Sequence, residues 1–346
     1  MTILFFTRLF YPHIGGVEKH IYEVGKRLIV QGHKVIIVTE IFDTNEKKIA
    51  NFNLKGFEIH RIHVRKDDSG KKFLIWKWLW QNRKIIRSAD IIHTHDVFFW
   101  YLPFRFIYPT KKVYITFHGY ETVFPLQKKA IFIRKVSEIL STGNIIVGDY
   151  IKKWYGTKPD TVTYGGVDEV STIKEKKLSK NNLNIVFIGR LEEDTGGLIY
   201  SEVLNILENN KVSFTFTALG DGSLRKTFAR WGEVKGFVKD TTTYVEKADI
   251  VFASSYLSIL QALVLKKVIV ATYDNQLKKD YLTLAPFKKW ITIEPDPVQL
   301  THAIMRYLEN PESFQSKISN GYEWAKKQTW EKVTNNYLNL WSINTK

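Results

Sequence analysis

Two short segments in the first half of the sequence have residue types that could bind a sugar or a phosphate. His118 and Gly119 directly follow the apolar run Val113–Phe117. A histidine at the end of a strand can point into a ligand-binding cleft, although it can also simply cap a turn. Gly15 and Gly16 follow the first apolar run and precede a helical pattern. Their backbone amides could approach a phosphate or a sugar at the start of that helix, and the alternative is a tight strand-to-helix turn.

Two segments in the second half could bind the phosphates of a nucleotide. Arg190 follows Gly189 at the end of an apolar run. The guanidinium of Arg190 could form two hydrogen bonds with a diphosphate, or it could belong to a solvated turn. Ser254 and Ser255 precede a helical pattern whose first backbone amides could receive an anion, although these serines could also be an ordinary N-cap. Together the two features favour a phosphate site in this half of the chain.

His93 and His95 could form part of a metal site. Residues two apart on a strand share a face, so both imidazoles could reach one ion. No third ligand is evident nearby, and we favour the interpretation that these are polar residues at a strand end. The sequence contains no D-x-D pair for a divalent metal, no G-x-G-x-x-G fingerprint and no Walker lysine motif. We therefore expect no metal and no cofactor.

These residues must be positioned by regular elements, and short apolar runs alternate with amphipathic stretches twice along the chain. Such alternation predicts an α/β protein built from βαβ units around parallel sheets. In the first half the predicted strands are Ile3–Thr7, Lys34–Thr39, Phe57–Ile62, Ile91–His93, Val113–Phe117 and Asn144–Val147, and the predicted helices are Val17–Ile29, Lys71–Arg87 and Lys128–Leu140. In the second half the predicted strands are Ile185–Ile188, Val212–Ala218, Val234–Phe237, Ile250–Ala253, Val268–Ala271 and Trp290–Ile293, and the predicted helices are Gly197–Glu208 and Tyr256–Leu265. The tail from Val298 to Trp341 is helical in pattern, with a break near Pro311.

A lysine- and asparagine-rich stretch, Val167–Asn184, separates the two series and is predicted to be a linker. We assign residues 1–167 to a first domain, 168–184 to the linker, 185–328 to a second domain and 329–346 to a closing helix. Doubly wound sheets bind ligands at the carboxyl ends of their strands. The two domains are therefore predicted to face a ligand-binding cleft.

Composition narrows the classes of partner. The chain has 346 residues, with 51 Lys and Arg against 35 Asp and Glu, so its formal net charge is +16. That charge favours phosphates, nucleic acid or an anionic membrane leaflet as partners. Cysteine is absent, which excludes disulfides and cysteine nucleophiles and fits a reducing compartment. The N-terminus has no signal-peptide pattern, and the most apolar stretch, Val97–Tyr108, is too short to span a bilayer. We expect a cytoplasmic location, soluble or peripheral at a membrane.

The ordered set of motifs resembles glycosyltransferase family 4, the retaining sugar-nucleotide transferases of GT-B fold. The first-half segments that look like landmarks of this family are ILFFTRLFYPHIGGVEKHIYEVGKRLIVQGHKVIIVT, DIIHTHD, TFHGYE and YGGVD. Those in the second half are VFIGRLEEDTGG, ALGDGSLRK, GFV, ADIVFASSYLSILQALVLKKVIVA and NGYEWAKKQTWEKVTNNYLNLW. The resemblance implies two doubly wound Rossmann-like domains facing a central cleft, with a C-terminal helix that crosses back to the first domain.

The resemblance also implies site residues. His118 would contact the transferred sugar near the reacting carbon, and Arg190 would hold the diphosphate, so both are assigned as catalytic. Gly16 would offer its backbone to the donor phosphate or the acceptor. The full donor-binding set is Gly15, Gly16, Gly189, Arg190, Thr195, Gly236, Phe237, Val238, Ser255, Tyr256, Leu257, Ser258 and Gln261.

The sequence departs from the family pattern at the donor site. The family's phosphate-binding lysine is Thr195 here, and Gln261 stands where a glutamate usually contacts the ribose. The other glutamate of the family's pair should fall near Ala253–Ser255, where there is no acid. Either a divergent branch compensates with backbone amides at a helix start, or catalysis is weak or absent. We favour the divergent branch because the remaining landmarks are kept.

The function implied is that of a hexosyltransferase in polysaccharide biosynthesis. It would move a sugar from a nucleoside diphosphate sugar to a glycan or lipid-linked acceptor, with retention and without metal. Three alternatives remain open: a non-catalytic sugar-nucleotide-binding protein, a sugar phosphorylase of the same fold, and a nucleic-acid-binding protein. The phosphorylase should carry a pyridoxal lysine, which we cannot identify. No nucleic-acid-binding motif is present either, so we expect no nucleic-acid partner.

The segment Lys71–Arg87 suggests where an acceptor could be presented. On one helix, an apolar face would be formed by Leu74, Ile75, Trp78, Leu79, Ile85 and Ile86. A second stripe, of alternating cations and tryptophans, would be formed by Lys72, Trp76, Trp80, Arg83 and Arg87. Tryptophan favours the membrane interface and cations favour an anionic leaflet, so the stripe predicts a peripheral enzyme on the inner leaflet. The alternative is that the tryptophans pack under the aromatic segment Phe98–Tyr108.

Overall fold

The structure is a computed structural model that describes residues 1–41, 53–54, 56–64, 70–119, 124–168, 182–238 and 240–343. The chain divides into two compact units, which are residues 1–163 with 330–346, and residues 164–329. Most of the predicted linker, residues 168–184, lies outside the described residues, as do Tyr120 and Glu121 of the TFHGYE segment. Each unit has its own parallel sheet, so the predicted α/β class with two Rossmann-like domains is confirmed.

An eight-stranded sheet lies at the centre of the first unit, in the order β3-β4-β2-β1-β5-β6-β7-β8. Neighbouring strands are parallel except β3 and β4. The strands are β1 (Thr2–Thr7), β2 (Lys34–Glu40), β3 (Asn53–Leu54), β4 (Phe57–Ile62), β5 (Ile91–His95), β6 (Lys112–Phe117), β7 (Gly143–Val147) and β8 (Thr161–Thr163). Strand order reverses between β1 and β5, so the carboxyl ends of these two strands form the switch point where a ligand site is expected.

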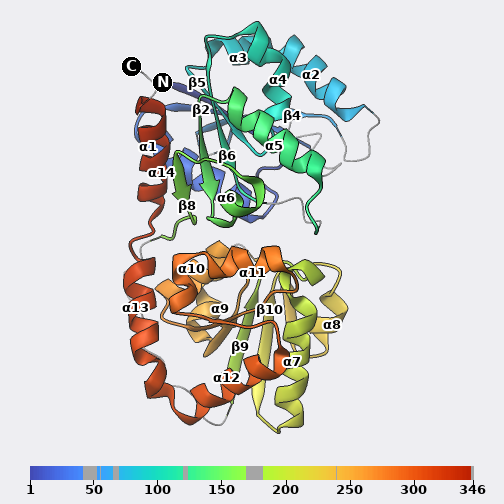
Figure 1. Ribbon diagram of the computed structural model, residues 1–346, viewed down its shortest axis with the longest axis vertical. Coiled ribbons are helices and arrows are strands. Elements are labelled where there is room, and N and C mark those ends of the chain that lie inside the picture. The colour runs from blue at the N-terminus through green and yellow to red at the C-terminus, as the bar shows by residue number, and fades with distance from the viewer. Residues whose placement is uncertain are drawn as a thin grey trace. The chain divides into compact units, whose positions relative to one another are not determined.

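Helices cover the sheet of the first unit. Its strands are therefore buried on both faces, which explains their nearly continuous runs of apolar residues. The helices are α1 (Gly16–Val30), α2 (Lys71–Gln81), α3 (Arg83–Ser88), α4 (Phe98–Ile107), α5 (Lys128–Leu140), α6 (Tyr150–Tyr155) and α14 (Trp330–Ile343). Figure 1 shows α14, from the end of the chain, running beside α1 from its beginning. Three aromatic side chains of α14 are fully buried in this unit, namely Trp330, Tyr337 and Trp341.

The prediction of a single helix over Lys71–Arg87 is wrong. The segment forms two helices, α2 and α3, that are separated at Asn82. The Asn82 side chain donates a hydrogen bond to the carbonyl of Trp78 at 2.9 Å, and this local bond competes with continuation of the helix. Leu74, which was predicted to be buried, is exposed. The predicted apolar residues that are buried are Ile75, Leu79 and Ile86.

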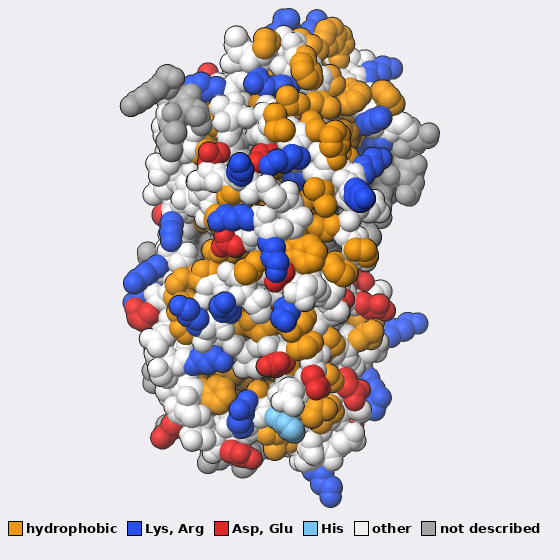
Figure 2. Space-filling view, viewed as in Figure 1, with side chains coloured by type: hydrophobic (Ala, Val, Ile, Leu, Met, Phe, Trp, Pro, Cys, Tyr) orange, Lys and Arg blue, Asp and Glu red, His pale blue; other side chains and the backbone are white. Residues whose placement is uncertain are grey.

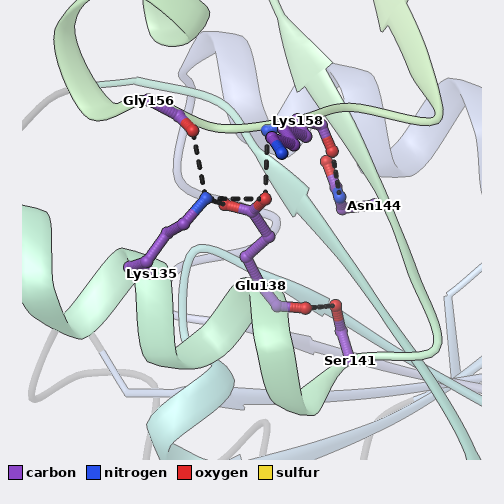
Figure 3. Close-up of polar contacts among 6 residues, drawn as sticks. All are labelled: Lys135, Glu138, Ser141, Asn144, Gly156 and Lys158. Atoms are coloured by element: carbon purple, nitrogen blue, oxygen red, sulfur yellow. Dashed lines mark hydrogen bonds and ion pairs between the residues drawn. The ribbon is translucent and has the colours of Figure 1, made fainter.

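A polar network fixes α5 to the loop between α6 and β8 (Figure 3). The Glu138 carboxylate accepts hydrogen bonds from Lys135 Nζ at 3.0 Å and from the Lys158 amide at 3.0 Å. Lys135 also donates to the carbonyl of Gly156, and Asn144 donates to the carbonyl of Lys158. Because a carboxylate with several donors is held in one place, this network helps to fix the position of the α5 backbone.

The second unit has a six-stranded parallel sheet in the order β11-β10-β9-β12-β13-β14. Its strands are β9 (Leu183–Ile188), β10 (Phe214–Leu219), β11 (Glu233–Gly236), β12 (Ile250–Phe252), β13 (Val268–Ala271) and β14 (Thr292–Ile293). The predicted strand Trp290–Ile293 is shorter than expected, because Trp290 closes the 3-10 helix Pro286–Lys289. Here the strand order reverses between β9 and β12, which places a second switch point at Gly189 and Ala253.

The helices of the second unit pack against this sheet or, like α13 on α10, against another helix. They are α7 (Gly197–Asn209), α8 (Arg225–Ala229), α9 (Thr242–Lys247), α10 (Tyr256–Val264), α11 (Gln276–Thr283), α12 (Pro297–Glu309) and α13 (Gln315–Ala325). The predicted break near Pro311 is a 3-10 turn, Pro311–Phe314, which the missing proline amide favours. Among the described residues of both units, no helix combines the length and the apolar character needed to cross a membrane.

Candidate functional site

The predicted histidine at the end of β6 lies at the carboxyl edge of the first unit's sheet and is held from several sides. The His118 amide donates to the Asp96 carboxylate at 3.0 Å, and His118 Nε2 shares a hydrogen bond with His95 Nδ1 at 2.9 Å. The His118 ring also meets the edge of His20, with ring centres 4.8 Å apart. His118 therefore has a defined orientation, and its side chain remains partly exposed.

Arg134 of α5 is a second residue that fixes this loop, and nothing in the sequence identified it. The buried guanidinium donates to the carbonyl of Gly119 at 2.6 Å and lies over the rings of Phe117 and Tyr155. A cation that contacts aromatic faces and a carbonyl is well stabilised in a low-dielectric environment. Since the Glu138 network positions α5, it also positions Arg134 and, through Gly119, the loop that follows β6.

Behind His118, a chain of hydrogen bonds connects β5, β6, α1 and α14. Trp341 Nε1 donates to His93 Nδ1 at 3.1 Å, and His93 Nε2 is 2.7 Å from the hydroxyl of Thr116. The Thr116 hydroxyl is 2.9 Å from that of Tyr337, which is 2.9 Å from His20 Nε2. An indole can only donate, so the proton of neutral His93 is on Nε2 and is donated to Thr116. A consistent direction then runs from Thr116 to Tyr337 and on to His20, and it gives each of these hydrogen bonds one donor and one acceptor.

The four histidines in and beside this hydrogen-bond network are neutral at pH 7. Burial lowers the pKa of His20 to about 3. Burial also lowers the pKa of His93, His95 and His118 well below the ordinary value for histidine, and each has a neighbouring histidine that would repel its charged form. The sequence showed three of these histidines individually, but their assembly with His20 and α14 could not be predicted from it.

The hypothesis of a metal site at His93 and His95 is wrong. Both nitrogens of His93 form hydrogen bonds, with Trp341 and Thr116, so neither has a lone pair directed at an ion. In the described part of the chain, no group of three or more His, Cys, Asp or Glu side chains could hold a metal ion.

Gly15 and Gly16 lie where the sequence predicted, at the start of α1. Gly15 is the N-cap, and Gly16 is the first helical residue. The Glu18 carboxylate lies against Gly15, where a Cβ atom would overlap it, and it is also 2.9 Å from His13 Nδ1. An acid in the first turn interacts favourably with the helix dipole. A phosphate at these amides would have to displace Glu18.

In the second unit, Gly189 and Arg190 follow β9 at the switch point. The Arg190 guanidinium is half-exposed and forms an ion pair with Asp194 at 2.7 Å. The Thr195 hydroxyl lies 2.7 Å from the carbonyl oxygens of both Arg190 and Glu192 and donates its one proton between them, so it closes the turn that carries the arginine. Thr195 therefore acts on the backbone of this loop.

Lys278 supplies a second cation close to Arg190, and the sequence did not identify it. It lies in the first turn of α11, only 8% exposed, with its ammonium 5.1 Å from the centre of the Tyr281 ring. Burial lowers the pKa of Lys278, while the charge of Asp194 raises it and that of Arg190 lowers it further, so the three charges interact electrostatically. The strand before α11 is β13, whose end contacts the loop after β9 through Thr272 and Gly196.

The start of α10 differs from the prediction of free amides. Ser255 is the N-cap, as expected, but the Tyr256 amide donates to the Tyr281 hydroxyl at 3.1 Å. The Tyr256 and Tyr281 rings stack with centres 4.0 Å apart. Ser255 and Ser258 share a hydrogen bond through their hydroxyls. Because Tyr281 already occupies the first amide, an anion could reach only the later amides of this turn, those of Leu257 and Ser258.

The predicted ribose and base contacts lie on two further elements. Gln261 on α10 accepts from Thr241 at 2.8 Å and donates to Thr242 at 3.4 Å, so its amide is engaged with the start of α9. Gly236 ends β11 with a positive φ of 71°. Phe237 and Val238 follow it, and the Phe237 side chain is exposed.

The predicted stripe of cations and tryptophans is only partly exposed. Trp76 Nε1 donates to the carbonyl of Phe99 on α4 at 3.0 Å, so this tryptophan packs against the aromatic segment, as the alternative held. Trp80 is 50% exposed and has Arg83 over its ring at 5.0 Å. Lys72 is exposed, and Arg87 lies over the ring of Tyr108, the residue that follows α4.

A broader surface of the first unit combines exposed apolar and basic side chains, and we call it the apolar–cationic surface. It covers α2, α4 and α5, and Figure 2 shows hydrophobic side chains there with Lys and Arg between them. Its exposed apolar residues are Phe73, Leu74, Trp80, Phe99, Phe106, Ile107, Phe132, Ile133 and Ile139. Its exposed lysines are Lys72, Lys77, Lys128 and Lys129. Neither α2 nor α4 contains an acidic residue.

Comparisons with known proteins agree with this architecture. The family model described as Glycosyltransferase Family 4 matches residues 14–169. An uncharacterized glycosyltransferase, MJ1178 of Methanocaldococcus jannaschii, is 23% identical over 94% of this chain and 93% of its own length. One subunit of the phosphatidylinositol N-acetylglucosaminyltransferase of Homo sapiens is 39% identical over 56 residues, which are 16% of this chain and only 11% of the human protein. A glycosyltransferase structure from Rickettsia africae ESF-5 superposes with a TM-score of 0.74 at 16% identity, over 100% of this chain and 99% of that one.

Proposed function

We propose that the chain is a member of Glycosyltransferase Family 4 that transfers a sugar from a nucleoside diphosphate sugar to a glycan or lipid-linked acceptor, because the model of that family matches residues 14–169 and a glycosyltransferase is similar over nearly the whole chain. The family places it among the hexosyltransferases. One observation carries the proposal for this chain: two electrostatically interacting cations, Arg190 and Lys278, lie on the segments that follow β9 and β13 at the carboxyl edge of the second unit's sheet. A pair of cations at a switch point suits the diphosphate of a sugar nucleotide.

Lys278 provides the charge that Thr195 lacks. In the free protein, Asp194 neutralises part of the cluster, and a diphosphate could take over the hydrogen bonds of Arg190. Fixed cations stabilise the negative charge that develops on a leaving diphosphate. We therefore propose transfer without a divalent metal. Retention is proposed from the resemblance to the family alone. A non-catalytic sugar-nucleotide-binding protein would share these contacts, and only turnover of the donor distinguishes it.

The donor site can be tested by thermal shift in the presence of a chelator. The ligands are a panel of sugar nucleotides and nucleoside diphosphates. At least one of these ligands is expected to raise the melting temperature, because a ligand that binds only the native state stabilises it. Lys278→Met is expected to weaken the binding free energy of that ligand by about 1.5–3 kcal/mol, the range for a hydrogen bond to a charged group. Lys279→Met is the matched control, since Lys279 is the next residue along the chain and its side chain is exposed.

Two results would count against this donor site. Stabilisation that appears only after a divalent ion is added would exclude the metal-free proposal. Equal affinity in the Lys278→Met and Lys279→Met proteins would remove Lys278 from the phosphate site.

The apolar–cationic surface supports the proposal of a lipid-linked acceptor at a membrane. Aromatic side chains favour the interface of a bilayer, and each Lys or Arg near an anionic leaflet adds about 1 kcal/mol. The human relative is named for phosphatidylinositol, which agrees with a lipid acceptor. We propose that the first unit docks on the inner leaflet of the cell membrane through α2, α4 and α5.

Vesicle co-sedimentation measures this docking. Binding is expected to rise with the fraction of anionic lipid and to fall with salt, because exposed charges are screened. The double variant Trp80→Ala and Phe106→Ala is expected to bind several-fold less, since it removes two exposed aromatic side chains. Trp231→Ala alters an aromatic residue of the second unit and serves as the control. No binding of the wild-type protein to anionic vesicles at low salt would end the membrane proposal and favour a soluble glycan acceptor.

A further inference from the structure

The imidazoles at the ends of β5 and β6 share one hydrogen bond, and its direction decides what His118 offers to a ligand. His95 Nδ1 and His118 Nε2 are 2.9 Å apart. Both rings are neutral at pH 7, because burial lowers the pKa of each. A neutral imidazole carries one N–H group, so only one of the two nitrogens can be the donor.

The other nitrogen of His95 distinguishes the two possibilities. His95 Nε2 is buried and has no hydrogen-bond partner in the part of the chain that the structure describes. If His118 donated, His95 would carry its proton on this buried nitrogen, where nothing accepts it. Orphaned buried N–H groups are rare in proteins, and a buried unsatisfied donor carries a desolvation penalty. If His95 donates instead, its buried Nε2 carries a lone pair that receives no hydrogen bond, which costs less than an unsatisfied N–H group.

We propose that His95 is a positioning residue that holds His118 in the tautomer with its proton on Nδ1. His118 then presents an N–H donor, which would bind a hydroxyl or phosphate oxygen of the substrate. Among the described residues, no group forms a hydrogen bond with His118 Nδ1, and the side chain is partly exposed. In this tautomer His118 cannot accept a proton at its free nitrogen, so it is a hydrogen-bond donor to substrate and not a general base.

The identity of the bound oxygen rests on the proposed function, but the tautomer is a property of the free protein. Nitrogen NMR of protein selectively labelled with ¹⁵N-histidine distinguishes protonated from bare ring nitrogens without any ligand. We expect both His95 and His118 to be protonated on Nδ1 at pH 7, with the signals assigned by their loss in His95→Asn and His118→Gln. A proton on His118 Nε2, or a charged His118 ring, would overturn the inference.

Two substitutions of His95 separate positioning from packing. Asn places an N–H close to the position of His95 Nδ1, whereas Leu fills similar volume without a donor. We expect His95→Asn to retain the His118 tautomer and turnover within about twofold. His95→Leu is expected to lose the single tautomer and to lower turnover about tenfold, equivalent to ~1.4 kcal/mol, with donor affinity unchanged. Equal loss in both variants, or reduced donor affinity in step with turnover, would contradict positioning. Absence of donor binding by the wild type would instead refute the proposed function and leave the NMR result valid.

Discussion

Acidification from pH 7 to about pH 5 is expected to unfold the first unit while the second unit remains folded. The pKa of His20 is lowered to about 3 by burial, and those of His93, His95 and His118 are also lowered. Below the unfolded-state pKa of about 6.5, the unfolded chain binds more protons than the folded one, so stability falls as pH falls. Each histidine then lowers the free energy of unfolding by on the order of 1 kcal/mol for each pH unit of acidification. Four together approach the roughly 5–15 kcal/mol that stabilises a domain.

Hydrogen exchange measured by mass spectrometry, corrected for the intrinsic effect of pH, follows the two units separately. His20→Gln removes one titrating group but keeps an acceptor for Tyr337, so the midpoint should move to lower pH. His63→Gln changes an exposed histidine of the same unit and should leave the midpoint unchanged. Loss of protection in both units at one pH, or in the second unit first, would contradict the role assigned to the buried histidines.

Gly220→Ala is expected to destabilise the second unit by about 3 kcal/mol or more, the upper range for single substitutions. Gly220 follows β10 with a positive φ of 154°, and a Cβ atom there would overlap the carbonyl oxygen of Gly189. That carbonyl belongs to the residue before Arg190, and relief of the overlap would require the end of β9 to move. The variant should therefore lose donor binding together with stability.

Denaturant unfolding and donor titration of the same protein measure both effects. Gly119→Ala is the control, since an added Cβ there meets no atom of the described residues within 4 Å, and its stability should stay within about 0.5 kcal/mol of wild type. If Gly220→Ala is as stable as wild type, the close approach of β9 and β10 at this edge is not as the structure describes it.

Apolar periodicity predicted most of the fold, because buried parallel strands and amphipathic helices follow simple spacing rules. The predicted strand Val268–Ala271 and helix Lys128–Leu140 have the observed bounds. The prediction failed at Asn82, where a side-chain hydrogen bond to Trp78 interrupts a helix whose apolar spacing continues. Such local competition leaves no mark on the hydrophobic pattern.

The candidate site was predicted in its parts but not in its assembly. His118 and Arg190 were identified because they directly follow strands of a doubly wound sheet. Arg134, Lys278 and His20 were missed, since each lies on a helix and reaches the site only through the tertiary fold. Tyr281, which occupies the Tyr256 amide, is likewise 25 residues from its partner. Sequence spacing carries no information about contacts of this kind.

Transfer of a labelled sugar tests the central claim most directly. The wild-type protein, with a chelator present, is incubated with the sugar nucleotide that gives the largest thermal shift and with a membrane lipid extract or glycan acceptors. We predict that label moves from the nucleotide to an acceptor, with release of the nucleoside diphosphate, and that His118→Ala lowers this turnover more than it lowers donor affinity. A donor that binds tightly but stays intact with every acceptor, with and without divalent ions, would contradict the assignment as a glycosyltransferase and leave a sugar-nucleotide-binding protein.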